Sequence, residues 1–154
     1  MDNTSAGQAG NSGVMDVSEQ TVCQDVASLM KFYKSRMAEF AEAHNLTPIQ
    51  LYALGALNQT PGQDGMTMGK LAHTLHCDAS NATGIVDRLV ALQLLTRQEN
   101  PADRRVKMLQ LTATGQRILK ALNAELPGRL NCHLLTADER VSLHNLISKL
   151  NTTP

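Results

Sequence analysis

The fold is decided by residues 67–111, which read TMGKLAHTLHCDASNATGIVDRLVALQLLTRQENPADRRVKMLQL. Apolar residues recur at helical spacing on both sides of a short break, His76-Cys77-Asp78, and Asp78 can cap the helix that follows it. Two short helices joined by a turn of about three residues form the helix-turn-helix layout. The predicted inward-facing residues are Leu71, Ala72, Leu75, Ala82, Ile85, Val86 and Leu89.

Beyond Leu92 the helical spacing is lost, and the chain predicts a β-hairpin. Residues 94–98 form its first strand and residues 106–111 its second, and the polar loop between them contains Pro101. Because this hairpin directly follows the helix-turn-helix, it is a candidate wing.

Further helices are predicted on both sides of this region. Before it, apolar residues at intervals of three and four mark one stripe on a helix from about residue 16 to residue 43. A capping box at Thr47 then begins the helix that leads into the helix-turn-helix. After the hairpin, Thr112 can cap a helix that Pro127 interrupts or kinks, and Thr136 begins another with a second capping box.

The chain is therefore expected to be mainly α-helical and to have three regions. Residues 1–15 are predicted to be a flexible tail, and residues 46–112 form a winged helix-turn-helix DNA-binding lobe. Residues 16–45 and 113–152 carry apolar stripes beyond what one small lobe needs, so we interpret them as dimerisation helices.

Several segments of the chain together resemble the MarR (multiple antibiotic resistance regulator) family. Residues 89–97 are similar to the end of the family's recognition helix and its first wing strand. Asp103-Arg104-Arg105, followed by residues 109–112 and Gly115, is similar to the family's wing signature, which is D-x-R, a short strand and L-T-x-x-G. The resemblance extends from about residue 20 to residue 150 and implies a winged helix-turn-helix with a small β-hairpin wing and N- and C-terminal dimerisation helices.

One residue departs from this pattern. Gln93 stands where the family usually has Gly, which lets a helix end in a left-handed conformation. Gln93 must adopt that conformation at some cost or end the helix in another way.

The charge distribution is compatible with DNA binding, although the net charge of the whole chain is zero. Residues 86–120 contain seven basic and three acidic residues, and a local basic region matters more for phosphate binding than the total. Aromatic residues make up only 3% of the chain and Trp is absent, which argues against a platform that stacks single-stranded bases.

The cysteines and the chain start suggest a cytoplasmic protein. Cys23, Cys77 and Cys132 form no CxxC pair, and an odd number without a signal peptide predicts free thiols. No stretch approaches the roughly 20 apolar residues of a membrane span. We expect no cofactor, no metal and no catalytic residue, because no nucleophile–base pair or Gly-rich phosphate loop is found. Zinc binding by His73, His76 and Cys77 is a weaker alternative, because a metal there would disturb DNA docking.

The second helix of the helix-turn-helix is the predicted recognition helix. Such a helix reads base edges with short polar side chains near its N-terminus, which also attracts phosphate. Asn81 can pair with adenine, although Ser80 and Asn81 can also serve only as helix caps. The predicted contacts are Ser80, Asn81, Thr83 and Gly84 for the bases and backbone approach, with Arg88 and Lys70 for phosphates.

The hairpin supplies the other predicted DNA contacts. The resemblance implies that Arg105 enters the minor groove, where narrow A·T-rich stretches have the most negative potential. Asp103 would orient an arginine, either Arg105 or Arg97, through a charge-assisted hydrogen bond. Arg104 and Lys107 would contact phosphates, although the same charges could simply keep a hairpin soluble.

The resemblance also implies a homodimer on a pseudo-palindromic operator and release by a small aromatic or phenolic ligand. The candidate pocket residues are Arg36, Met37, His44 and Tyr52. We thus expect a transcriptional regulator that binds double-stranded DNA. It is expected to act as a repressor and not to be an enzyme. Two alternatives are a winged-helix module that binds protein, and a redox sensor through Cys23, whose neighbours Gln24 and Asp25 offer no positive charge to favour the thiolate.

Overall fold

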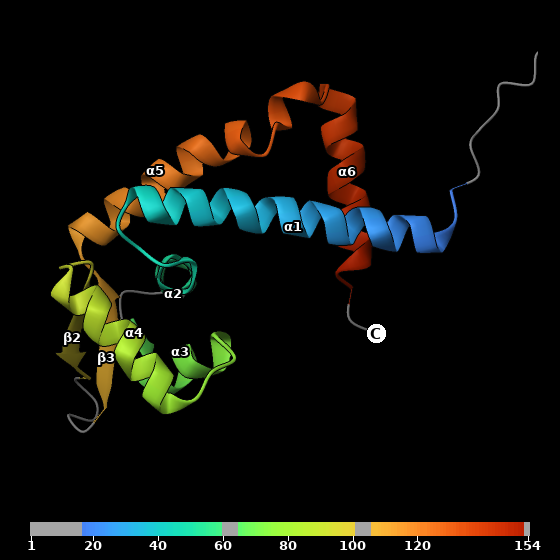
Figure 1. Ribbon diagram of the computed structural model, residues 1–154. Coiled ribbons are helices and arrows are strands. Elements are labelled where there is room, and N and C mark those ends of the chain that lie inside the picture. The colour runs from blue at the N-terminus through green and yellow to red at the C-terminus, as the bar shows by residue number, and fades with distance from the viewer. Residues whose placement is uncertain (1–16, 60–64, 101–105, 153–154) are drawn as a thin grey trace, which may run out of the picture. The chain divides into compact units, whose positions relative to one another are not determined.

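The computed structural model describes residues 17–59, 65–100 and 106–152 (Figure 1). These residues fall into two units, divided between Phe32 and Tyr33. The elements in chain order are α1 (Glu19–Ala43), α2 (Pro48–Asn58), β1 (Met66–Thr67), α3 (Met68–Thr74), α4 (Ala79–Ala91), β2 (Leu95–Glu99), β3 (Lys107–Leu111), α5 (Ala113–Arg129), the 3₁₀ helix η1 (Cys132–Leu134) and α6 (Ala137–Leu150).

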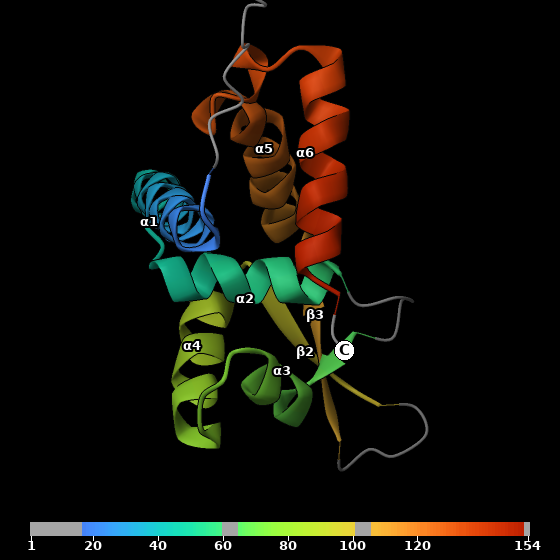
Figure 2. The same ribbon diagram turned by 90° about the vertical axis from the view of Figure 1, so that its right-hand side faces the viewer.

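The predicted helix-turn-helix consists of α3 and α4, which pack against each other and against α2. Helix α2 lies between this pair and α5 (Figure 2). The core is apolar, and its largest fully buried side chains are Phe40, Leu51, Leu54, Leu71, Leu89, Leu95, Leu109 and Val86. Of the predicted inward-facing residues, Ile85 is only partly buried and the others are buried. The apolar pattern of the sequence therefore identified the packed faces of both helices.

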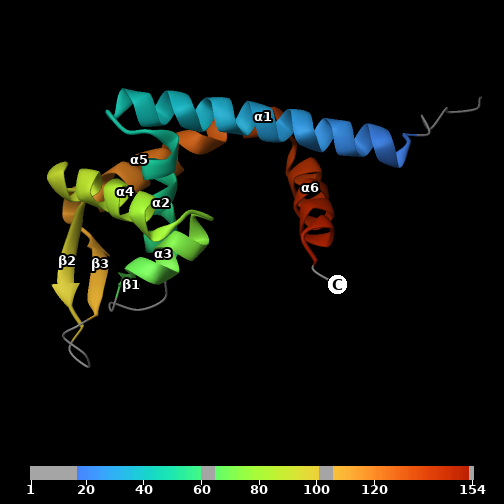
Figure 3. The same ribbon diagram turned by 60° about the horizontal axis from the view of Figure 1, so that its bottom comes forward.

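The predicted hairpin is formed by β2 and β3, which pair antiparallel with Leu95 opposite Leu111 and Glu99 opposite Lys107. The hairpin lies beside α3 and α4 (Figure 3). A third strand, β1, was not predicted, and it pairs with the other edge of β3 to give the order β1-β3-β2. It ties the start of α3 to the sheet, so that the helix-turn-helix and the wing share one framework.

The predicted helix starts are confirmed. Thr47, Asp78, Thr112 and Thr136 each accept a hydrogen bond from the backbone N–H three residues later, at the N-terminus of α2, α4, α5 and α6. Complete capping boxes are present at Thr47 and Thr136. Of the two effects predicted at Pro127, an interruption is wrong, because α5 continues through it to Arg129, and a kink stays a prediction. A proline removes one hydrogen bond from the helix, and here it does so in the last turn.

The end of α4 is held to the start of α5 by hydrogen bonds. Gln93 takes the left-handed conformation, with φ of +58°, and its N–H and that of Leu94 donate to Val90 and Leu89 in a Schellman motif. The Thr112 hydroxyl donates to the Gln93 carbonyl at 2.7 Å. Gly115 is required beside this junction, because a Cβ there would lie 2.4 Å from the Leu94 carbonyl oxygen. These contacts give a physical reason for the residues of the L-T-x-x-G segment.

Candidate functional site

The recognition helix α4 presents the predicted polar residues to solvent. Its inner face is fully buried through Ala82, Val86 and Leu89. The residues on its outer face that are exposed include Ser80, Asn81, Thr83, Gly84 and Arg88. A Cβ at Gly84 would meet nothing within 4 Å, so no packing contact of the protein requires glycine there. The helix therefore offers a polar surface with little side-chain bulk at its centre.

Hydrogen bonds fix two of the polar side chains on this surface. Asp78 Oδ1 accepts from the Asn81 backbone N–H at 2.8 Å, and Asp78 Oδ2 accepts from Asn81 Nδ2 at 2.8 Å. The Thr83 hydroxyl donates to the Ala79 carbonyl at 2.7 Å, so its proton is already used within the helix. A carboxylate thus occupies the capping position of α4, which weakens the expected attraction of phosphate to this helix end.

The wing-strand cations are each paired with a carboxylate. Arg97 Nη2 donates to Asp87 Oδ1 at 2.5 Å, which links β2 to α4. Lys107 Nζ donates to Glu99 Oε1 at 2.8 Å across the hairpin. Sequence reasoning missed Asp87 as a partner, although it lies one position before Arg88 on the exposed face. Asp103, Arg104 and Arg105 lie outside the described residues.

A shallow groove of about 630 Å³ brings three of the predicted DNA contacts together. Thr83 of α4, Arg97 of β2 and Lys107 of β3 line it, along with residues at the start of α3. The groove thus joins the recognition helix and the wing into one surface with two basic side chains.

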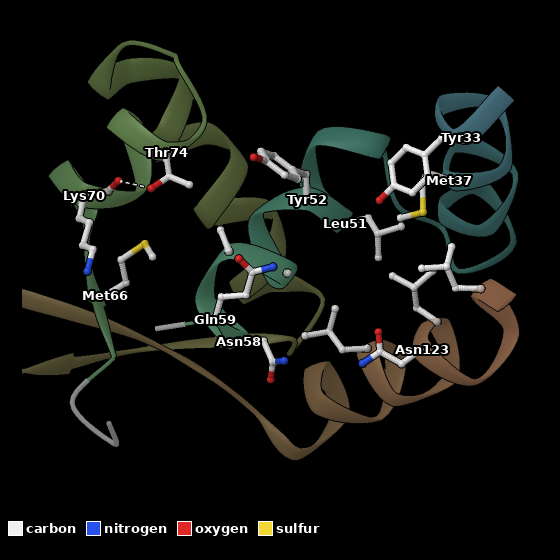
Figure 4. Close-up of a pocket in the computed structure, with 15 residues that line it drawn as sticks. Tyr33, Met37, Leu51, Tyr52, Asn58, Gln59, Met66, Lys70, Thr74 and Asn123 are labelled. Atoms are coloured by element: carbon white, nitrogen blue, oxygen red, sulfur yellow. Dashed lines mark hydrogen bonds between the residues drawn. The ribbon is translucent and has the colours of Figure 1, made fainter. Parts of the chain in front are cut away.

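A separate pocket of about 430 Å³ lies among α1, α2, α3 and α5 (Figure 4). Met37 and Tyr52 line it, as expected, together with Tyr33 and Asn123. Lys70, predicted as a phosphate contact, also lines this pocket and is its one charged residue among those described. In Figure 4, Lys70 and Thr74 lie at one end of the group of lining residues, and Tyr33 and Met37 lie at the other.

The other two predicted pocket residues are not among those that line this pocket. Arg36 Nη2 pairs with Glu39 at 2.5 Å within α1. His44 Nδ1 lies 2.9 Å from the Phe40 carbonyl oxygen, and its ring stacks on Phe40 with centroids 4.2 Å apart. His44 therefore packs at the end of α1.

Metal sites and membrane-spanning helices are absent from residues 17–59, 65–100 and 106–152. Within these ranges no group of three or more His, Cys, Asp or Glu residues could hold a metal. The His73 and His76 rings lie 6.4 Å apart, and Cys23, Cys77 and Cys132 are free. In the same part of the chain, no helix is long and apolar enough to cross a membrane.

Comparison with known sequences gives consistent matches. A family model described as the MarR family matches residues 44–106. The transcriptional repressor NicR of Pseudomonas putida is 30% identical over 146 residues, which cover 91% of this chain and 90% of NicR. The Bacillus subtilis regulator YsmB is 31% identical over 87 residues, which cover 56% of this chain and only 58% of YsmB. These relatives are named as transcriptional regulators and not as enzymes.

Comparison with solved structures shows the same fold. Escherichia coli MarR in its apo form aligns with a TM-score of 0.69 at 23% identity and covers 85% of this chain and 96% of MarR. Bordetella bronchiseptica BpsR aligns with a TM-score of 0.64 at 23% identity and covers 92% of this chain and 100% of BpsR. Because the fold matches these proteins and the sequence matches NicR over nine-tenths of its length, the chain belongs to the MarR family of winged helix-turn-helix transcriptional regulators.

Proposed function

We propose that this regulator is a homodimeric repressor that binds a pseudo-palindromic operator and is released from it by a small aromatic or phenolic ligand. The observation that carries the proposal is the exposed polar face of α4 beside the paired strands β2 and β3. Short polar side chains on an exposed helix suit the major groove, and a hairpin beside it suits the backbone or the minor groove.

The repressor assignment rests on the relatives. NicR and the Bacillus subtilis protein MdtR are both named as repressors, and MdtR aligns over 79% of its length. Rhodopseudomonas palustris BadR is named as an activator, but its alignment spans only 46% of BadR. A solved structure of an Escherichia coli MarR mutant contains operator DNA, which supports the choice of duplex DNA as the partner.

Exposed apolar residues support the proposal of a homodimer. In the first unit, Val22, Val26, Leu29 and Met30 of α1 are exposed. In the second unit, Val141, Leu143, Leu146, Ile147 and Leu150 of α6 are exposed as well. Contiguous exposed apolar surface on a protein often marks an interface. We assign residues 16–45 and 113–152 to dimerisation and residues 46–112 to DNA binding, with two recognition helices about 34–36 Å apart on successive turns of DNA.

The pocket among α1, α2, α3 and α5 is the proposed ligand site. Tyr33, Met37 and Tyr52 offer apolar and aromatic surface, and Lys70 offers a positive charge for an acidic group. The structure of BpsR is described in terms of regulation of its DNA binding by 6-hydroxynicotinic acid, an aromatic acid. A ligand that contacts both Lys70 on α3 and residues of α1 would alter DNA affinity if it prefers one arrangement of these helices.

A fluorescence anisotropy titration against the protein's own promoter at several salt concentrations tests the DNA proposal. We expect tight binding. A plot of the logarithm of the association constant against the logarithm of salt concentration should have a slope of about −0.9 per neutralised phosphate. Binding to that promoter no tighter than to random duplex would contradict the proposal.

The same titration tests the wing through Arg105→Ala. We expect its affinity for the promoter to fall by about 1–3 kcal/mol if Arg105 reads bases. Arg117→Ala is the matched control, because Arg117 donates to Thr114 within α5 and is not a predicted DNA contact. An affinity unchanged by Arg105→Ala would remove the wing tip from the mechanism.

A thermal-shift screen of aromatic acids and phenols, with 6-hydroxynicotinic acid included, tests the ligand proposal. Gly55 lines the pocket, and a Cβ there would meet nothing within 4 Å, so Gly55→Leu should fill the pocket without disturbing the core. We expect this variant to bind promoter DNA normally and to lose both the thermal shift and release by ligand. Gly128→Leu is the control, because Gly128 has similar space around it and does not line the pocket. Release that persists in Gly55→Leu would place the ligand elsewhere.

A further inference from the structure

We propose that Asp78 is a positioning residue that turns the Asn81 amide so that it reads adenine, and rejects guanine, in the major groove. The inference rests on the proposed function, because it needs α4 to enter that groove. It adds a positioning residue that makes no DNA contact of its own, and a physical reason why Asn81 would reject guanine. The carrying observation is that the Asp78 carboxylate accepts two hydrogen bonds from Asn81, one from its backbone N–H and one from its side-chain amide.

The two bonds use different oxygens of one carboxylate. Asp78 Oδ1 accepts from the Asn81 backbone N–H at 2.8 Å and caps α4. Asp78 Oδ2 accepts from Asn81 Nδ2, also at 2.8 Å. The cap fixes Asp78 relative to the helix, and the second oxygen then fixes the side chain of Asn81 relative to Asp78.

The chemistry of the carboxylate decides which way the amide faces. An ionised carboxylate can only accept hydrogen bonds, so the group of Asn81 that faces it must be the NH₂ and not the carbonyl oxygen. One N–H of Asn81 is therefore used by Asp78. The amide retains one free N–H and one free oxygen, both on an exposed side chain.

One donor and one acceptor match adenine and not guanine. Adenine presents an acceptor at N7 and a donor at N6 in the major groove, whereas guanine presents acceptors at both N7 and O6. An unrestrained asparagine has two N–H groups and could donate both to guanine. Because Asp78 occupies one of these N–H groups, Asn81 can make two hydrogen bonds with adenine but only one with guanine.

The neighbouring threonine does not duplicate this role. The Thr83 hydroxyl donates its proton to the Ala79 carbonyl at 2.7 Å, so it presents only an acceptor to DNA. Asn81 thus supplies the donor–acceptor pair that distinguishes adenine within this stretch of α4.

The test measures base discrimination rather than affinity. Anisotropy titrations with promoter duplexes, each carrying one A·T to G·C change, first locate the positions where Asn81→Ala lowers the preference for A·T. At such a position, we expect the unaltered protein to prefer A·T by about 5-fold to 150-fold, the range that a bidentate contact supplies. Asp78→Asn keeps an oxygen that can cap α4 but removes the acceptor for Asn81 Nδ2, so this preference should fall to about twofold or less.

Two controls separate orientation from charge and from folding. Asp78→Asn removes a negative charge and should raise affinity for every duplex, but a ratio of affinities cancels that effect. Asp78→Ser also retains a capping side chain, and it should reproduce the loss of discrimination if Asp78→Asn proves unstable in thermal melts.

A double-mutant cycle completes the test. In the Asn81→Ala background, Asp78→Asn should have no effect on the A·T preference, since the amide that it orients is gone. Discrimination that survives in both Asp78→Asn and Asp78→Ser would overturn the role of Asp78 and leave the proposed function intact. If Asn81→Ala leaves the A·T preference unchanged at every promoter position, the role of Asp78 would be overturned as well. Only a failure of the unaltered protein to prefer its promoter would count against the proposed function itself.

Discussion

Gln93 ends the recognition helix in a conformation that favours glycine. Its φ of +58° lies in the left-handed region, which costs a residue with a side chain about 1–2 kcal/mol. Asn45, His76 and Asn131 have similar φ values after α1, α3 and α5. Asparagine and histidine adopt this conformation more readily than most residues do, so Gln93 is less suited to it than these three residues are.

Gln93→Gly should therefore stabilise the fold. Relief of the left-handed strain exceeds the extra entropy that glycine loses on folding, so we expect the free energy of unfolding to rise by about 0.5–1 kcal/mol. Gln116→Gly is the matched control, because Gln116 is exposed within α5 and glycine inside a helix costs about 1 kcal/mol. Urea denaturation would measure the free energy of unfolding of both variants, which should rise for Gln93→Gly and fall for Gln116→Gly. A destabilised Gln93→Gly would show that the Gln93 side chain makes compensating contacts.

Individual residues also show what the sequence could predict about the site. Ser80, Asn81 and Thr83 were expected on the outer face of α4, because helical spacing alone determines which residues are opposite the apolar ones. The partner of Arg97 was not predictable from spacing. Asp87 is ten residues away in sequence, and only the packing of β2 against α4 brings the two side chains together. The proposed role of Asp103 remains a prediction.

Among the elements, α6 has a pH-sensitive start. Glu139 completes the capping box of this helix by accepting from the Thr136 backbone N–H at 2.8 Å. Two hydrogen bonds hold the pKa of the Glu139 carboxyl below its ordinary value of 4.5. The bond with the Thr136 backbone is the larger cause of this lower pKa, and the bond with the Thr136 side chain is the smaller. The folded protein thus favours the ionised form of Glu139.

The stability of α6 should accordingly fall in acid. A carboxyl group whose pKa is lowered by folding stabilises the protein above its unfolded pKa, near 4.5, and this contribution is lost as the pH falls through the lower folded value. We expect the difference in thermal stability between the unaltered protein and Glu139→Gln to be constant at neutral pH and to shrink below about pH 4.5. A difference that stays constant down to pH 3 would contradict the role of Glu139 in the cap.

The elements differed in how far the sequence could predict them. Helix starts were predictable because Thr47, Asp78, Thr112 and Thr136 carry the capping chemistry in their own side chains. Strand β1 was not predictable, because its two residues gain their strand geometry from pairing with Leu109 and Met108 of β3. The end of α5 was misjudged for a related reason. Pro127 is two positions from the last residue of α5, where a proline removes little of the hydrogen bonding of a helix, and local rules do not say where the end lies.

At the scale of the whole molecule, we propose that the exposed apolar residues of α1 and α6 form the dimer interface of the regulator. Leu146 is 60% exposed and is one of several exposed apolar residues on α6, and a group of such residues on one helix often marks an interface. If a second copy covers it, each operator is held by two lobes. The slope of log affinity against log salt is then proportional to the number of phosphates that the two lobes neutralise together.

Leu146→Glu should therefore change assembly and salt dependence together. A buried unpaired charge at the interface should convert the dimer to monomer in sedimentation velocity, and the slope of log affinity against log salt should fall to about half. Asn145→Glu adds the same charge to an exposed position of α6 and should change neither quantity. If Leu146→Glu does not fold, the melting temperature of the unaltered protein should still rise with its concentration, as mass action requires of a dimer that unfolds to separate chains. A melting temperature independent of concentration, or a full salt slope from a monomeric Leu146→Glu, would refute the dimer as the DNA-binding form.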